Sequence, residues 1–169
     1  MQTADHKIIH KLAEMLVNEL SRNGKVIATA ESCTGGWVGK AITDIPGSSN
    51  VYGYGVISYA NGAKESILGV NNGSLERYGS VSLKVVEEMA VGSLRLSGAN
   101  IAVAVSGIAG PDGGTEEKPV GTVWFGWAMR DGNKELIETA CEHFTGDRDL
   151  IREASVVYAL QGALDRINN

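Results

Sequence analysis

The sequence contains little cysteine and proline and has no long hydrophobic run. Its 169 residues include two cysteines and three prolines, and no apolar segment approaches the roughly 20 residues that a membrane-spanning helix needs. Cys33 and Cys141 are too few for a disulfide framework, which fits a reducing compartment. The charged N-terminal segment also lacks the apolar core of a signal peptide. We therefore expect a cytoplasmic protein without membrane association.

Positive charge is also scarce. The chain has 15 basic and 20 acidic residues and a formal net charge of −5. Sequence-independent binding to nucleic acid needs clustered cations, so no nucleic-acid partner is expected. The three histidines include one pair at helical spacing, His6 and His10, but no third metal ligand follows them. Glycine is abundant instead: its 22 residues are about twice its average share, which predicts tight turns and close backbone contacts.

Hydrophobic periodicity and turn residues predict alternating helices and strands. In chain order these are a helix at 5–22, a strand at 25–30, a helix at 35–43, a strand at 51–59, a helix at 63–68, turns at 71–80, a helix from Ser82 to about 96, strands at 101–105, 122–129 and 136–144, and a helix capped by Asp147 to about 167. The first helix has an apolar stripe of Ile9, Leu12, Ala13, Leu16, Val17 and Leu20, and the last one of Leu150, Ala154, Val157, Leu160 and Leu164.

The order of these elements defines a fold class. The strand at 101–105 is continuously apolar, as expected of a strand covered on both faces. Helices that alternate with such strands favour an α/β fold, here a three-layer α/β/α sandwich. The last two strands are joined at Asp131-Gly132, a good hairpin turn, so the sheet should be mixed and mostly parallel. We expect a single domain over residues 1–169.

Three segments at predicted strand ends combine reactive side chains with glycine. They are TAESCTGG (29–36), SYANGAK (58–64) and SGIAGPDGGTEEKPVG (106–121). Open α/β sheets bind their ligands at the carboxyl ends of the strands, so these segments are candidates for one site. The third is long and contains five glycines, which allow a ligand to approach the backbone closely.

The first two segments contain a nucleophile and a base. Ser32 and Cys33 lie where a strand meets a helix, and free N–H groups there favour an anion or a developing oxyanion. A serine needs a base, and a desolvated Lys64 assisted by Tyr59 is able to act as one. Two simpler interpretations remain open: Ser32 and Thr34 only cap the helix, and Lys64 is a solvated surface lysine. No standard hydrolase or nucleotide-binding motif surrounds these residues.

Taken together, the segments resemble the CinA C-terminal-domain family, whose characterised members include nicotinamide mononucleotide (NMN) deamidases. The matching stretches include AESCTGG (30–36), SGIAGPDGG (106–114) and KPVGTVW (118–124). The resemblance spans roughly residues 30–153, and the combination of these three motifs is highly specific. Larger CinA proteins carry a separate N-terminal domain, so the resemblance is to the stand-alone form.

The resemblance implies an activity. It is hydrolysis of the carboxamide of NMN to nicotinic acid mononucleotide and ammonia, in pyridine nucleotide recycling. The family is described as using a serine nucleophile with a lysine and a tyrosine, which match Ser32, Lys64 and Tyr59 here. Tyr59 would relay or orient the proton that passes from Ser32 to Lys64. Because the nucleophile is a side chain, no metal or other cofactor is expected.

Binding of this substrate would involve further residues. Its 5′-phosphate needs a cation or free N–H groups, for which Arg148 is the first candidate and the amides of the 34–36 turn are the second. The backbone of the third segment would contact the base or ribose and help to hold the oxyanion. The predicted binding residues are Thr34, Gly35, Gly36, Ser106, Gly107, Gly110 and Arg148.

Two other functions remain possible at this point. A catalytically silent paralogue would bind the nucleotide without hydrolysing it; Ala60, which stands where the family often has serine, motivates this alternative. Alternatively, Cys33 would be the nucleophile in place of Ser32. Trp124 and Trp127 have odd spacing and cannot both face one core, so one of them is a candidate for the interface of a homo-oligomer, with a dimer favoured.

Overall fold

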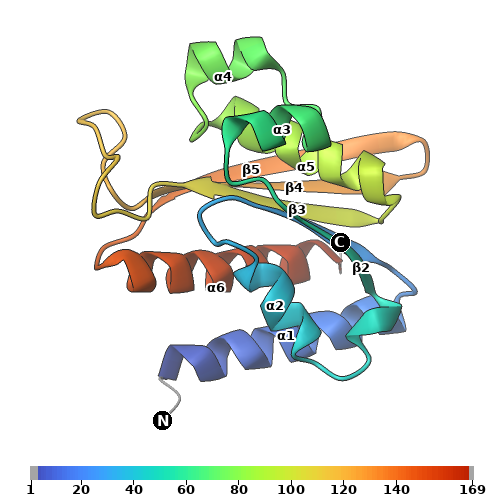
Figure 1. The fold of residues 1–169 in the computed structure, drawn as a ribbon. Coiled ribbons are helices and arrows are strands. Elements are labelled where there is room, and N and C mark those ends of the chain that lie inside the picture. The colour runs from blue at the N-terminus through green and yellow to red at the C-terminus, as the bar shows by residue number, and fades with distance from the viewer. Residues whose placement is uncertain (1–3, 168–169) are drawn as a thin grey trace.

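The computed structural model describes residues 4–167, which form a five-stranded sheet with helices on both faces (Figure 1). The strand order is β2-β1-β3-β4-β5. β1 pairs in parallel with β2 and β3, whereas β4 is antiparallel to β3 and β5, so only β4 runs against the others. The mixed, mostly parallel sheet is therefore confirmed. The strands are β1 (Ile27–Glu31), β2 (Tyr52–Ile57), β3 (Ile101–Gly107), β4 (Thr122–Asp131) and β5 (Lys134–His143).

Helices cover the sheet in two layers, as the three-layer prediction requires (Figure 1). One face carries α1 (Ala4–Arg22), α2 (Trp37–Thr43) and α6 (Arg148–Ile167). The other carries α3 (Asn61–Leu68), α4 (Asn72–Tyr78) and α5 (Leu83–Ser97). A short 3₁₀ helix, η1 (Ser48–Asn50), precedes β2. None of the helices within 4–167 is long and apolar enough to cross a bilayer.

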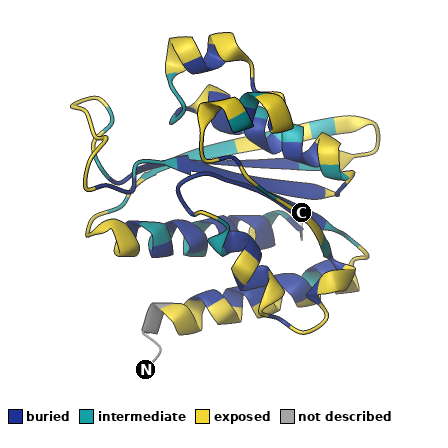
Figure 2. Ribbon diagram, viewed as in Figure 1, coloured by how far each residue is buried: buried dark blue, intermediate teal, exposed yellow. Residues whose placement is uncertain are grey.

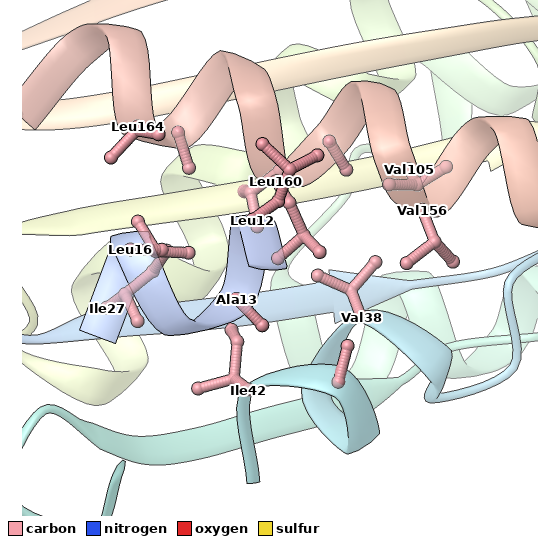
Figure 3. Packing of buried hydrophobic residues seen from close by; sticks show 14 of the residues in the cluster. Leu12, Ala13, Leu16, Ile27, Val38, Ile42, Val105, Val156, Leu160 and Leu164 are labelled. Carbon is pink, nitrogen blue, oxygen red and sulfur yellow. The ribbon is translucent and has the colours of Figure 1, made fainter. Parts of the chain in front are cut away.

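Side-chain size separates the two faces of the central strands. Ile and Val of β1 and β3 face α1, α2 and α6, whereas alanines of the same strands face α5. The predicted stripe of α1 is buried in the first of these cores, where α1, α2 and α6 interdigitate (Figures 2 and 3). Each large aliphatic side chain buried in this way contributes about 1.5–3 kcal/mol to folding. The small residues on the other face let α5 lie close to the sheet.

The two tryptophans of β4 lie on opposite faces of the sheet. Trp127 is buried under α6, and its indole N–H donates to the carbonyl of Ala159 (3.3 Å). The glycine at 162 makes this fit possible, since a Cβ there would lie 2.2 Å from the ring. Trp124 is partly buried against the α5 core. Both positions are thus explained by the two cores, and the predicted oligomer stays a prediction.

Three details differ from the sequence-based expectation. Residues 71–80 were expected to be turns but contain α4, which begins after Asn71, whose side chain accepts from the N–H of Gly73. The β4–β5 hairpin turns at Gly132-Asn133, one residue later than predicted, with φ +60° at the glycine. The inward face of α6 is also rotated: Leu150 is 49% exposed, whereas Ile151 and Val156 are buried. The sequence of α6 contains two overlapping apolar stripes. The stripe that includes Ile151 and Val156 is the one buried in the core shared with α1.

Candidate active site

The three predicted segments meet at the carboxyl ends of β1, β2 and β3. Because these strands are parallel, the residues that follow them lie at one edge of the sheet. A cavity of about 270 Å³ opens there. Its lining includes seven of the predicted residues: Ser32, Tyr59, Lys64, Ser106, Gly107, Gly110 and Arg148. Larger hollows lie elsewhere, among them one between α3 and α5 and one between α1 and α6, but no hydrogen bond joins a hydroxyl or thiol to a base in the lining of these two.

Ser32 and Lys64 are in direct contact inside this cavity. The Lys64 Nζ and Ser32 Oγ atoms are 3.0 Å apart, and the lysine is 1% exposed. Nζ also donates to the carbonyls of Ser58 (2.7 Å) and Tyr59 (3.2 Å). A neutral amine has two N–H groups and one lone pair. Nζ thus has three acceptors around it, which matches the three N–H groups of an ammonium. When the amine is neutral and its two N–H groups stay on the carbonyls, the lone pair faces the hydroxyl of Ser32, which then becomes the donor.

The surroundings of Lys64 favour this neutral form. Burial lowers the pKa of its ammonium group, because the charged form loses its hydration in the protein interior. A general base must be deprotonated to act, so the lowered pKa raises the fraction of Lys64 that is able to accept a proton. The alternative of a solvated surface lysine is therefore wrong.

The turn that carries Ser32 is held from within by Glu31. The buried carboxylate of this residue accepts hydrogen bonds from the Thr34 hydroxyl (2.7 Å) and from the N–H groups of Gly36, Val38 and Gly39 (2.8–3.0 Å). The start of α2 thus holds an anion, but the anion is a side chain of the protein itself. Sequence reasoning missed Glu31; an acidic residue just before a helix start was the available signal.

This arrangement corrects the expected role of residues 34–36. The hydroxyl of Thr34 and the N–H of Gly36 both donate to Glu31, and the N–H of Gly35 donates to the carbonyl of Ser32 (3.0 Å). None of the three residues lines the cavity around Ser32. The Thr34 hydroxyl and the N–H groups of Gly35 and Gly36 are therefore not available to the phosphate of a substrate.

Tyr59 and Arg148 form a second pair, at the cavity wall. The guanidinium of Arg148 donates to the Tyr59 phenol (3.0 Å) and to the carbonyl of Gly110 (2.6 Å). The phenol is not bonded to Ser32 or Lys64, which contact each other directly, so the expected proton relay through Tyr59 has no geometric basis. Tyr59 reaches Lys64 only through its backbone carbonyl.

Backbone N–H groups are available beside Ser32. Those of Cys33, Ala109 and Gly110 belong to cavity-lining residues and donate to no acceptor within residues 4–167. Cys33 directly follows the serine, the position from which hydrolases commonly supply an oxyanion donor. The hydroxyl of Ser106, by contrast, donates to the carbonyl of Ser80 (2.7 Å) and so connects the third segment to the turn before α5.

Known proteins match this chain over most of its length. The family model described as the CinA C-terminal domain matches residues 9–167. The chain belongs to the CinA family. Two relatives are the nicotinamide-nucleotide amidohydrolases PncC of Enterobacter agglomerans, 51% identical over 94% of each chain, and of Escherichia coli K12, 52% identical over 89% of this chain and 90% of that one.

Solved structures of the CinA family have the same fold. The competence/damage inducible protein CihA from Agrobacterium tumefaciens superposes with a TM-score of 0.89 at 41% identity, covering 100% of this chain and 99% of that one. The competence damage-inducible protein A from Klebsiella pneumoniae gives a TM-score of 0.90 at 37% identity, covering 95% and 98%.

One departure from the CinA family pattern has a structural explanation. Ala60, where the family often has serine, is the N-cap residue of α3 and provides no side-chain cap. A serine there would cap the helix that carries Lys64. Ala60 is exposed and does not line the cavity, so an alanine at this position leaves the described site intact.

The other candidate nucleophile is poorly activated. The thiol of Cys33 belongs to the core formed with α1 and α6. Burial raises its pKa to about 11, so it stays protonated at neutral pH. Ser32 is therefore the better candidate. Among the described residues, no group of three or more His, Cys, Asp or Glu side chains is arranged to hold a metal ion.

Proposed function

We propose that the protein hydrolyses the carboxamide of NMN to nicotinic acid mononucleotide and ammonia. The observation that supports this most strongly is the 3.0 Å contact between the Ser32 hydroxyl and the buried amine of Lys64. Relatives about half identical in sequence are named nicotinamide-nucleotide amidohydrolases. A cavity with a nucleophile inside and an arginine at its wall also suits a substrate that carries an amide and a phosphate.

Acylation begins with proton transfer. Neutral Lys64 takes the proton of Ser32 as its oxygen attacks the carboxamide carbon, and a tetrahedral oxyanion forms. The N–H groups of Cys33 and of the 109–110 loop would stabilise that oxyanion, and such donors are typically worth about 3–4 kcal/mol each. The Lys64 ammonium then protonates the leaving nitrogen, and ammonia departs.

Deacylation reverses the roles. Water enters the vacated position and gives a proton to Lys64 as it attacks the acyl-enzyme ester. Collapse of the second tetrahedral intermediate returns the proton from Lys64 to Ser32 and releases the carboxylic acid of the product, which then loses its own proton to water. A single base thus serves both half-reactions, as in other serine-dependent acyl transfers.

Arg148 is the proposed phosphate ligand. Its guanidinium has five donors, and only two hydrogen bonds within the described chain occupy them. The remaining N–H groups are sufficient for a phosphate oxygen pair. Tyr59, held by the same guanidinium, would then lie against the bound nucleotide, and the backbone of residues 106–110 would contact its base or ribose.

Ammonia release from NMN tests the proposal. Wild-type protein should release ammonia, Ser32→Ala and Lys64→Met should not, and Lys40→Ala, which removes an exposed lysine of α2, should behave as wild type. Activity that persists in Ser32→Ala but is lost in Cys33→Ala would assign the reaction to the thiol. Folded wild type that is stabilised by NMN without releasing ammonia would instead be a silent nucleotide-binding paralogue.

The remaining expectations are separate proposals. We infer a single domain and a cytoplasmic location from length and composition, and we keep a homo-oligomer, a dimer in the first instance, as a proposal in which the partly exposed edge of Trp124 lies at the interface. Sedimentation of wild type beside Trp124→Ala tests the last of these. A monomeric wild-type protein would contradict it.

A further inference from the structure

Arg152 of α6 contacts the nucleophile turn from outside the cavity. Its Nε donates to the carbonyl of Cys33 (3.1 Å) and its Nη2 to the carbonyl of Thr34 (3.2 Å). These are the first two carbonyls after Ser32, and 118 or more residues separate them from the arginine along the chain. One planar guanidinium therefore holds two successive peptide units of this turn.

The guanidinium of Arg152 lies outside the substrate cavity. It lines a separate hollow with His6, Gly36, Trp37 and Lys40, and its Cζ atom is 5.5 Å from the centroid of the Trp37 ring. Arg152 is absent from the lining of the cavity around Ser32. A substrate at Ser32 is therefore out of its reach, and any effect on the reaction must act through the turn.

The turn is thus held from both helical layers. Lys64 reaches Ser32 from α3, on one face of the sheet, and Arg152 reaches the next two residues from α6, on the other (Figure 1). The carbonyl of Cys33 accepts no other hydrogen bond within residues 4–167, so Arg152 alone fixes that peptide plane.

Peptide geometry connects these contacts to the reacting groups. In a trans peptide the C=O and N–H point in opposite directions, so a carbonyl fixed on one side fixes the neighbouring N–H on the other. The N–H of Gly35 holds the Ser32 carbonyl (3.0 Å), which sets the direction of the Cys33 N–H. Arg152 also holds the carbonyl of Thr34, which belongs to the same peptide unit as the N–H of Gly35, and so supports the contact between Gly35 and Ser32. Without Arg152, that unit keeps only the N–H of Trp37 as a donor to its carbonyl (3.2 Å), and the direction of the Cys33 N–H is held less firmly.

We propose that Arg152 is a positioning residue, which orients the Ser32 hydroxyl and the Cys33 N–H for attack on the substrate. The proposal rests on the proposed function, in which Ser32 is the nucleophile. It predicts slower chemistry with little change in substrate binding. A displacement of about 1 Å at a reacting group is able to cost about 100-fold in rate.

The experiment compares Arg152→Met, Arg152→Lys and a matched control, Arg95→Met, which removes an exposed arginine paired with Glu135. Three quantities are measured: kcat and KM for ammonia release from NMN, the rate at which an uncharged fluorophosphonate labels Ser32, and the melting temperature. Arg152→Met should lower kcat and the labelling rate together by about 10- to 100-fold, with KM near the wild-type value. Arg152→Lys should recover part of both rates, and Arg95→Met should match wild type.

The other outcomes either overturn the proposal or separate it from the proposed function. A raised KM with normal labelling would make Arg152 a substrate ligand, and a lowered melting temperature with normal rates per folded molecule would make it purely structural. If wild type labels at Ser32 but releases no ammonia, the proposed function fails, while the labelling rates still test Arg152. A wild-type protein that neither labels nor releases ammonia overturns both.

Discussion

Replacement of Glu31 by glutamine should destabilise the protein strongly, although the two side chains have nearly the same shape. Oε2 of Glu31 accepts three hydrogen bonds, and Oε1 accepts a fourth from the N–H of Gly39. Glutamine has one acceptor oxygen with two lone pairs, and its NH₂ group is a donor. The NH₂ group would meet the N–H of Gly39, so that bond is lost, and the three bonds to the remaining oxygen lose the negative charge that strengthens them. We take the combined effect as equivalent to the loss of two bonds.

The magnitude follows from the number of lost bonds. A hydrogen bond to a charged group contributes about 1.5–3 kcal/mol, so the loss of two gives about 3–6 kcal/mol. Because the turn relaxes, we expect the free energy of unfolding to fall by about 3 kcal/mol. This is a large part of the roughly 5–15 kcal/mol that stabilise a domain. For a chain of this length we expect the melting temperature to fall by about 6–12 °C.

Equilibrium unfolding in urea, followed by circular dichroism, measures this effect. Thr34→Val removes one of the four donors and should cost less than Glu31→Gln, about 1–2 kcal/mol. Glu117→Gln makes the same chemical change on an exposed loop and should stay within about 0.5 kcal/mol of wild type. A loss of less than about 1 kcal/mol in Glu31→Gln, with an unchanged urea dependence, would refute the bonding argument.

Four further predictions follow from the site and the cores. Ala60→Ser should add a cap to α3 and raise the free energy of unfolding by about 0.5–1 kcal/mol without loss of kcat, as thermal unfolding and ammonia release will show. Arg148→Met should raise KM for NMN far more than it lowers kcat, and an unchanged KM would exclude the phosphate assignment. Because burial lowers the pKa of Lys64, kcat/KM should rise with pH through a pKa below lysine's ordinary value. Over the window from that lowered pKa to the ordinary one, only the unfolded chain binds the proton, so stability should also rise with pH, and the rise should be absent in Lys64→Met. Gly162→Ala should destabilise by about 1–3 kcal/mol in urea, since its Cβ would lie 2.2 Å from the Trp127 ring; a neutral effect would mean that α6 is free to shift.

The sequence was sufficient to predict the layers and to place Ser32 and Lys64 at one edge of the sheet, whereas their proposed roles came from the family resemblance. The alternation of apolar strands with amphipathic helices indicated the sandwich, and Ser82 and Asp147 cap α5 and α6 as expected. Ser32 and Lys64 were brought together by one topological rule, that parallel strands end at the same edge of a sheet. Both predictions used only local composition and this rule, and neither depended on how the side chains pack.

Long-range side-chain contacts were beyond such rules. Arg152 lies 119 residues from the carbonyl of Cys33, and no local pattern connects them. Glu31 looked like an ordinary acidic residue until its carboxylate was seen to use the donors expected to bind phosphate. The phenol of Tyr59 turns to Arg148, 89 residues away, because their two segments meet only in the folded chain.

The β4–β5 hairpin offers a practical attachment point. β3 pairs with β4 so that Gly107, at the cavity end, lies opposite Val123, whereas Ile101 lies opposite Met129, next to the hairpin tip. By this register, the tip at 131–134 lies at the end of the sheet remote from the cavity. The residues of the tip are exposed (Figure 2). Exposed loop tips tolerate insertions well. A reporter domain or an immobilisation tag inserted between Gly132 and Asn133 should leave the end of the sheet with the Ser32 cavity facing free solution.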